Sequence, residues 1–187
     1  KSRFVEMFEP LDYSDNTLLL SDLANIASGI TKGRRVQSGT PLTEVPYMAV
    51  SNVKDGYIDR TVIKTIGVTP AELDKYRLFP NDVLMTEGGD PDKLGRGALL
   101  ADPPKDCIHQ NHVFRVRIDS ASEMLPQWFA MYLQSPYAKR YFLRCAKRTT
   151  GIATINKRQI GNLPVRLPPL SLQREFAVFA AQADKSR

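Results

Sequence analysis

The stretch from about residue 30 to residue 118 consists of short β-like segments separated by turn sequences, and this pattern limits the fold more than any other feature. Branched and aromatic residues gather in short runs such as Tyr47–Val50, Thr61–Ile66 and Val83–Met85. Between such runs lie turn sequences, among them Ser38-Gly39-Thr40-Pro41 and Lys54-Asp55-Gly56. Runs this short are typical of strands, so the middle of the chain predicts a sheet of many short strands.

Helical patterns lie on both sides of this β-rich stretch. Ser21–Ala27 predicts a short helix, and residues 125–134 are amphipathic. Ser135-Pro136 is a cap followed by a first-turn proline, which indicates the start of a basic helix reaching Lys147 or Arg148. A final helix, capped by Ser171, has apolar residues at spacings of four, three and four, a coiled-coil-like seam with no evident partner inside the domain: Leu172, Phe176, Phe179 and Ala183.

The length of 187 residues fits one domain that can bury a core. We therefore predict an α/β (α+β) fold: a curved, multi-stranded, mostly antiparallel sheet with peripheral helices and a C-terminal coiled-coil-like helix. No apolar run approaches the roughly 18 residues of a membrane span, and the first residues are unlike a signal peptide. The isolated Cys107 and Cys145 suit a reducing compartment. We expect a soluble, cytoplasmic protein.

Positive charge is concentrated in the last third of the chain. The net charge is +6, yet the 51 residues between Glu123 and Glu175 contain no carboxylate and nine basic residues. The rest of the chain contains 17 basic and 20 acidic residues, so its net charge is slightly negative. Such asymmetry favours a polyanionic partner, above all nucleic acid, over the alternative of a solvated basic face without a partner.

The best candidate for reading DNA is the segment that follows the basic helix. It combines cations, which bind phosphates, with Thr and Asn, which hydrogen-bond to base edges. The alternative is a packed connector whose threonines bond to their own backbone. With the end of the helix, this segment holds the first set of candidate DNA-binding residues: Lys147, Arg148, Thr149, Thr150, Gly151, Thr154, Asn156, Lys157 and Arg158.

Two further places hold candidate DNA contacts. The segment from Glu87 to Gly97 has four glycines and predicts an exposed, adaptable loop in which Lys93 and Arg96 contact DNA. Apolar residues alternate with Arg115 and Arg117 up to Ile118, which predicts a half-buried strand with both arginines on its open face.

Patterns for catalysis are weak. Asp102-Pro103-Pro104-Lys105 resembles a methyltransferase loop, but Lys105 stands where the stacking aromatic is needed and no glycine-rich cofactor loop precedes it. Cys107, His109 and His112 are close in sequence, but on a strand His112 faces away from the other two and a fourth zinc ligand is missing. We expect no catalytic residue, no cofactor and no metal.

The most specific motifs of the sequence lie in the closing part of the chain. The strongest element is Leu167-Pro168-Pro169-Leu170 followed by a helix with an early glutamine in Gln173-Arg174-Glu175-Phe176. Supporting elements are Gly39-Thr40-Pro41, the Asn81-Asp82-Val83-Leu84 turn, Thr150-Gly151 and Ile160-Gly161-Asn162-Leu163. With these elements the chain resembles the specificity subunits of type I restriction-modification systems, and the resemblance covers nearly the whole chain as one target-recognition domain.

The resemblance implies double-stranded DNA as the ligand, with one half of a split site read by each recognition domain. It also implies methyltransferase (modification) subunits as partners, which link the chain to the restriction subunit, and pairing with a second recognition domain or with itself. Residues 1–9 become the end of a helical connector, residues 10–169 the DNA-binding domain and residues 170–187 the start of a connector helix. The alternatives are a DNA methyltransferase or nuclease fragment and a basic protein-interaction scaffold.

Overall fold

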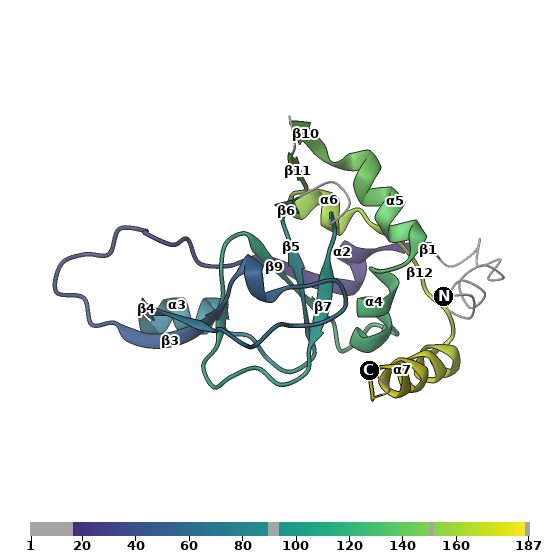
Figure 1. Cartoon of the computed structure of the whole chain (residues 1–187), viewed down its shortest axis with the longest axis horizontal. Coiled ribbons are helices and arrows are strands. Elements are labelled where there is room, and N and C mark those ends of the chain that lie inside the picture. Colours follow the sequence, from purple (N-terminus) through teal and green to yellow (C-terminus); the bar gives the residue numbers. More distant parts are fainter. Residues whose placement is uncertain (1–16, 90–93, 150–151, 186–187) are drawn as a thin grey trace.

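The computed structural model describes residues 17–89, 94–149 and 152–185, and it confirms the predicted mixture of helices with mainly antiparallel strands (Figure 1). The described helices are Leu20–Leu23 (α2), Pro70–Tyr76 (α3), Pro126–Tyr132 (α4), Pro136–Cys145 (α5), Lys157–Gly161 (α6) and Leu170–Lys185 (α7), with a 3-10 turn at Val50–Asn52 (η1). The described strands are Thr17–Leu19 (β1), Ala24–Ser28 (β2), Thr43–Met48 (β3), Lys64–Val68 (β4), Asp82–Thr86 (β5), Gly88–Gly89 (β6), Gly97–Leu100 (β7), Ile108–His109 (β8), Val113–Ile118 (β9), Lys147–Thr149 (β10), Ile152–Thr154 (β11) and Pro164–Arg166 (β12).

The centre of the molecule is an antiparallel sheet with strand order β2, β9, β5, β7. Side chains alternate across it, so successive residues enter two different apolar cores. Val83 and Met85 face the larger core, which the C-terminal helices cover, whereas Leu84 faces a smaller core on the other side. The sheet is therefore buried on both faces around β5.

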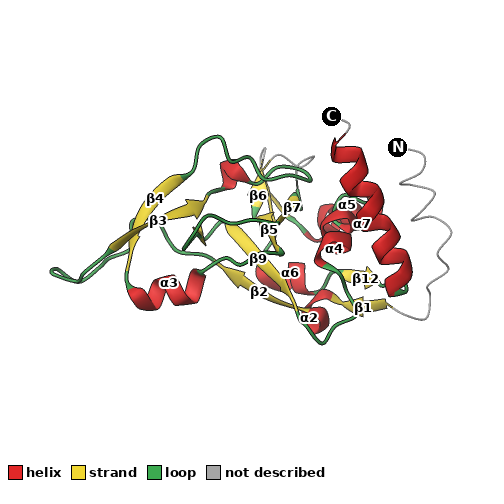
Figure 2. Cartoon of the chain, turned by 90° about the horizontal axis from the view of Figure 1, so that it is seen from below, coloured by secondary structure: helices red, strands yellow, loops and turns green. Residues whose placement is uncertain are grey.

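Smaller sheets extend the centre in two directions. β3 pairs antiparallel with β4 and parallel with β8. β3, β4 and α3 form the end of the molecule that is opposite the C-terminal helices (Figure 2). β1 pairs with β12, and β11 lies between β10 and β6. The strands thus lie in several connected small sheets, because frequent turns keep each pairing short.

The final helix packs against the domain. Phe176 is buried in the larger core, and the fully buried Gln173 accepts a hydrogen bond from Leu125 N at 2.8 Å. Its Nε2 donates to Glu123 O and Pro168 O, each at 2.8 Å. The expectation that this helix lacks a partner inside the domain is therefore wrong at Phe176, since α4 and the segment before it receive this face.

Local sequence patterns predicted one helix start correctly and one helix end incorrectly. Thr69 caps α3, and Ser135 caps α5 by accepting from Ala138 N at 3.3 Å. The helix expected over Ser21–Ala27 ends at Leu23, because Ala24–Ser28 pairs with β9 as a strand.

The assigned role of residues 170–187 remains a prediction, although α7 does begin at Leu170. Residues 1–9 lie outside the described part. No helix of the described residues is both long and apolar enough to cross a bilayer.

Candidate nucleic-acid interface

The two segments predicted as separate loops meet in one small sheet. Gly88 of the glycine-rich segment pairs with Thr154, and Gly89 pairs with Ala153. A side chain at Gly88 would place its Cβ 2.7 Å from Ala153 O, so only glycine allows this approach. Ile155 N donates to Glu87 O at 2.8 Å, which extends the contact. The structure therefore joins both segments into one surface at the corner formed by β6, β10 and β11 (Figure 1).

The basic helix α5 supports the glycine-rich segment from the side. Gly95 has φ +70°, and a Cβ there would overlap the ring of Phe142, which is fully buried. Gly95 therefore permits both the left-handed turn and close packing against α5. Arg96, the next residue, is half-buried.

The following helix, α6, presents two of the predicted cations. Asn156 caps it by accepting from Gln159 N at 2.9 Å, while Gln159 Oε1 accepts from Asn156 N at 2.8 Å. Asn156 thus has a structural role as a cap, and Lys157 and Arg158 extend from the first turn as exposed side chains.

Next to α6 lies an open cavity of about 520 Å³ that combines these cations with amide groups. Lys157 and Arg158 line it together with Ser21, Asn25 and Asn162. Cations bind phosphate oxygens, and amides pair with base edges, so the lining has the chemistry that nucleic-acid recognition needs. The sequence pattern gives no sign that Ser21 and Asn25 line this cavity, because they lie over 130 residues before α6.

A hydrogen-bonded link fixes α5 against α6. Tyr141 Oη donates to Gln159 O at 2.8 Å, and Gln159 Nε2 donates to Cys145 O. Burial is the main factor that raises the pKa of Tyr141 to about 12, so its hydroxyl stays protonated and can donate. The cations on the two helices are therefore held in a fixed relation.

Arg115 and Arg117 do share one face of β9, but this face is not open. Arg117 binds the buried Asp82, and Arg115 is 8% exposed and donates to Asn25 Oδ1 at 2.7 Å. Burial lowers the pKa of Arg115. The expected open face is wrong for Arg115, because the smaller core covers that side of β9; a role of either arginine in binding DNA remains a prediction.

The other predicted residues lie as follows. Lys147 is exposed on β10, and Thr154 is half-buried on β11. Arg148 and Thr149 lie on β10, and their backbones pair with β11. Lys93, Thr150 and Gly151 lie outside the described residues.

The Cys107, His109 and His112 group has other surroundings than a zinc site. Burial raises the pKa of Cys107 to about 12 and is the main factor that lowers the pKa of His109 to about 4. His109 Nδ1 donates to Val113 O at 2.7 Å. In the described part of the chain, no three His, Cys, Asp or Glu side chains lie close enough together to hold a metal ion.

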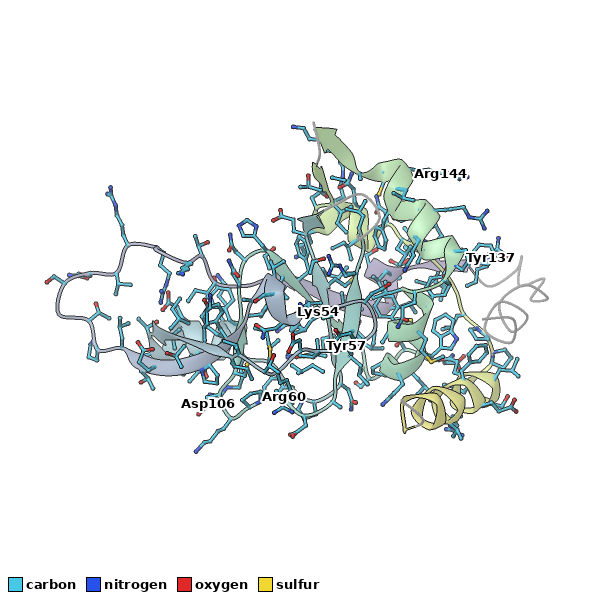
Figure 3. All side chains as sticks on the ribbon, viewed as in Figure 1. Lys54, Tyr57, Arg60, Asp106, Tyr137 and Arg144 are labelled. Carbon is cyan, nitrogen blue, oxygen red and sulfur yellow. The ribbon has the colours of Figure 1, made fainter. Side chains whose placement is uncertain are left out.

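Three arginines that the candidate set omitted lie on the outer side of α5 and on β12. Arg140, Arg144 and Arg166 are exposed and line an open cavity of about 360 Å³ together with Tyr137 (Figure 3 labels Tyr137 and Arg144 on α5). The acid-free stretch contains all three, but their spacing in sequence gives no sign that they meet.

The curated proteins that resemble this chain are of one kind. No protein-family model matches the chain. The type I restriction enzyme EcoKI specificity subunit of Escherichia coli K12 is 28% identical over 135 residues, which are 70% of this chain and 28% of that protein. The protein described as the MjaX specificity subunit of Methanocaldococcus jannaschii is 23% identical over 164 residues, 87% of this chain and 38% of that protein. The chain therefore spans roughly a third of the length of these curated relatives.

Solved structures show the same fold. The HsdS subunit from Thermoanaerobacter tengcongensis matches with a TM-score of 0.61 at 17% identity, over 99% of this chain and 42% of that chain. A chain from a structure of type I restriction-modification complex assembly gives 0.60 at 17% identity over 91% and 38%, and the S subunit from M. genitalium gives 0.55 at 14% identity over 91% and 39%. The named relatives and the shared fold agree, and the chain is thus related to the specificity subunits of type I restriction-modification systems, to which it corresponds over a single domain.

Proposed function

We propose that the chain is a sequence-specific DNA-binding domain, which recognises one half of a bipartite target. The observation that supports this most is the meeting of the glycine-rich segment with the acid-free basic segment at β6 and β11. Loops held on a rigid support are the usual carriers of base recognition, and the adjoining helices supply cations for the phosphates.

The cations near this corner are available to a ligand. Lys147, Lys157 and Arg158 are exposed, and no carboxylate among the described residues forms an ion pair with them. Lys157 and Arg158 also line the cavity with Asn25 and Asn162, whose amides both donate and accept hydrogen bonds. Phosphate binding would set affinity and salt dependence, while loop and amide groups would discriminate between bases.

Chemistry on the DNA would be carried out by partners. We propose methyltransferase (modification) subunits as the direct partners, with the restriction subunit reached through them, and a second recognition domain or a second copy of the chain for the other half-site. The domain itself would act in the cytoplasm without a cofactor. These proposals rest on the relatives, which are named as specificity subunits of restriction enzymes.

The test is a map of methylated bases in cells that carry the domain within its complete complex, compared with cells that lack only this chain. We expect one recurring split motif that disappears without the chain. A Lys157→Ala, Arg158→Ala double variant should reduce methylation at that motif. Absence of any chain-dependent motif, together with no salt-dependent binding of the chain to duplex DNA, would contradict the proposal.

A separate measurement distinguishes a reader from an enzyme. S-adenosylmethionine is added to the purified chain, and the melting temperature is followed. We expect no shift, because the domain is proposed to hold no cofactor. A saturable rise in melting temperature would instead indicate a methyltransferase fragment.

A further inference from the structure

We propose that Tyr137, Arg140, Arg144 and Arg166 form a binding site for the DNA backbone, which we call the Tyr137 cluster. It extends the interface from the corner formed by β6, β10 and β11, which we call the loop corner, along the outer side of α5. This inference rests on the proposed DNA-binding function, and it assigns a part of the phosphate contacts to residues outside the candidate set.

The cluster is organised around one aromatic ring. The guanidinium carbon of Arg140 lies 5.3 Å from the centroid of the Tyr137 ring, and that of Arg166 lies 5.0 Å from it. Arg140 follows Tyr137 by three residues on α5, whereas Arg166 comes from β12. Tyr132 Oη donates to Pro164 O at 2.8 Å, which holds β12 against α4. Two separate elements thus deliver positive charge to the same ring.

The positive charges in the cluster are not neutralised by the domain. No carboxylate among the described residues forms an ion pair with Arg140, Arg144 or Arg166. Besides its contact with the ring, Arg140 donates from Nε to Pro136 O at 3.2 Å. By contrast, Lys139, one residue before Arg140, is bound to Asp55 at 2.7 Å. The ring orders two guanidinium groups through cation–π contacts without cancelling their charge. Such preorganised cations lower the entropic cost of binding an anion.

The shape of the cluster favours an extended phosphodiester strand. Arg140 and Arg144 are four residues apart on α5, so their Cα atoms differ by about 6 Å along the helix axis. Phosphates on one DNA strand follow each other at about 3.4 Å of duplex axis, which allows both arginines to contact nearby phosphates. α5 also leads directly to β10 of the loop corner. A DNA strand bound at the loop corner can therefore contact cations continuously along β10 and α5.

The experiment measures binding of the purified chain to a mixed-sequence 20-base-pair duplex over a range of salt concentrations. The variants are Arg140→Ala, Arg166→Ala, Tyr137→Phe and Tyr137→Leu. Arg60→Ala is the matched control, because Arg60 is an exposed arginine far from α5 (Figure 3). Melting temperatures of all variants show whether they fold.

A plot of log affinity against log salt has a negative slope. We expect each arginine variant of α5 or β12 to make this slope shallower by about 1, as for one lost phosphate contact. Tyr137→Leu should weaken binding several-fold, Tyr137→Phe should bind like the wild type because the ring is retained, and Arg60→Ala should leave the slope unchanged. If the wild type binds DNA but Arg140→Ala and Arg166→Ala keep its slope, the Tyr137 cluster is not a backbone site. Stronger binding of the wild type to polyglutamate than to the duplex would overturn it in favour of an acidic protein partner. A wild type that binds neither probe overturns the Tyr137 cluster as a DNA site and, together with the absence of a chain-dependent methylation motif, contradicts the proposed function itself, an outcome distinct from an unchanged slope.

Discussion

Arg117 binds Asp82 through both carboxylate oxygens: its Nε lies 2.7 Å from Oδ1, and its Nη2 lies 2.8 Å from Oδ2. Asp82 is 1% exposed and also accepts from Phe79 N at 2.7 Å, while the Arg117 guanidinium lies over the Phe79 ring. The pair therefore fastens the turn before β5 to β9. It gives the buried end of β5 a polar anchor that depends on both partners.

Replacing Asp82 by alanine should be strongly destabilising. The change leaves a guanidinium that is two-thirds buried without its partner and removes the acceptor of Phe79 N. We expect the free energy of unfolding in urea to fall by about 3 kcal/mol. Asp74→Ala is the control, since its carboxylate is 79% exposed and lies 3.7 Å from Arg77; it should cost less than about 0.5 kcal/mol. Equal losses in the two variants would show that the Asp82 pair is no stronger than a surface pair.

His109 should make the fold less stable in weak acid. Burial is the main factor that lowers the pKa of His109 from 6.5 to about 4, so between these values the unfolded chain binds a proton that the folded chain does not. Stability from this group is complete above pH 6.5 and falls by up to about 3 kcal/mol as the pH drops to 4. Urea unfolding at pH 7 and pH 4.5 measures the loss.

The matched variant for this prediction is His109→Asn, which keeps a donor for Val113 O but does not titrate. It should lose less stability than the wild type between the two pH values. Glu72 does not interfere with this comparison. The hydrogen bond from Arg34 is the main factor that lowers the pKa of Glu72 to about 2, so the stability that ionised Glu72 contributes is lost only between pH 4.5 and 2, and equally in both proteins. Identical losses in the wild type and in His109→Asn would contradict the prediction.

Gly95→Ala should disturb the contact between the glycine-rich segment and α5. The residue needs a left-handed backbone, and its Cβ would overlap Phe142. Gly33→Ala is the control, because Gly33 has φ +75° and nothing within 4 Å of its Cβ. We expect about 1 kcal/mol for Gly33→Ala from the backbone alone. Thermal unfolding should show a further loss of about 1–3 kcal/mol for Gly95→Ala.

Gln173→Glu should loosen α7 at neutral pH and recover in acid. The glutamate keeps an acceptor for Leu125 N but loses the two hydrogen bonds that Nε2 donates to Glu123 O and Pro168 O. We expect a loss of about 2–4 kcal/mol at pH 7. Since the carboxylate faces two carbonyl oxygens, its folded pKa is expected above its unfolded value, and protonation should restore part of the stability as the pH falls. Gln37→Glu, at an exposed position, should show neither effect in urea unfolding.

Sequence signals predicted elements whose causes are local. Ser135 marks the start of α5, since a cap bonds within three residues of itself. The alternation around Arg115 and Arg117 identified β9 and placed both side chains on one face. It gave no sign that the face is covered, because Asp82 and the smaller core come from other parts of the chain.

The interface could not be predicted from sequence, because it depends on long-range contacts that no local pattern contains. A helix was predicted over Ser21–Ala27, yet pairing with β9 makes Ala24–Ser28 a strand. Both glycine-rich and threonine-rich segments were identified, but their pairing joins residues that are far apart in sequence: Gly88 and Thr154 are 66 positions apart, and Gly89 and Ala153 are 64. Arg166 reaches the ring of Tyr137 from β12, a strand that follows α5 much later in the chain and that Tyr132 holds against α4.

The pairing of Gly88 with Thr154 has a consequence for protein engineering. Because the segments around these residues share one small sheet, each supplies part of the shape of the other. Grafting one of them alone from a related domain would create a mismatched pair, whereas a transfer that includes both segments and α5 would keep their joint shape. New target sequences are therefore best sought by exchanging this three-part unit as a whole.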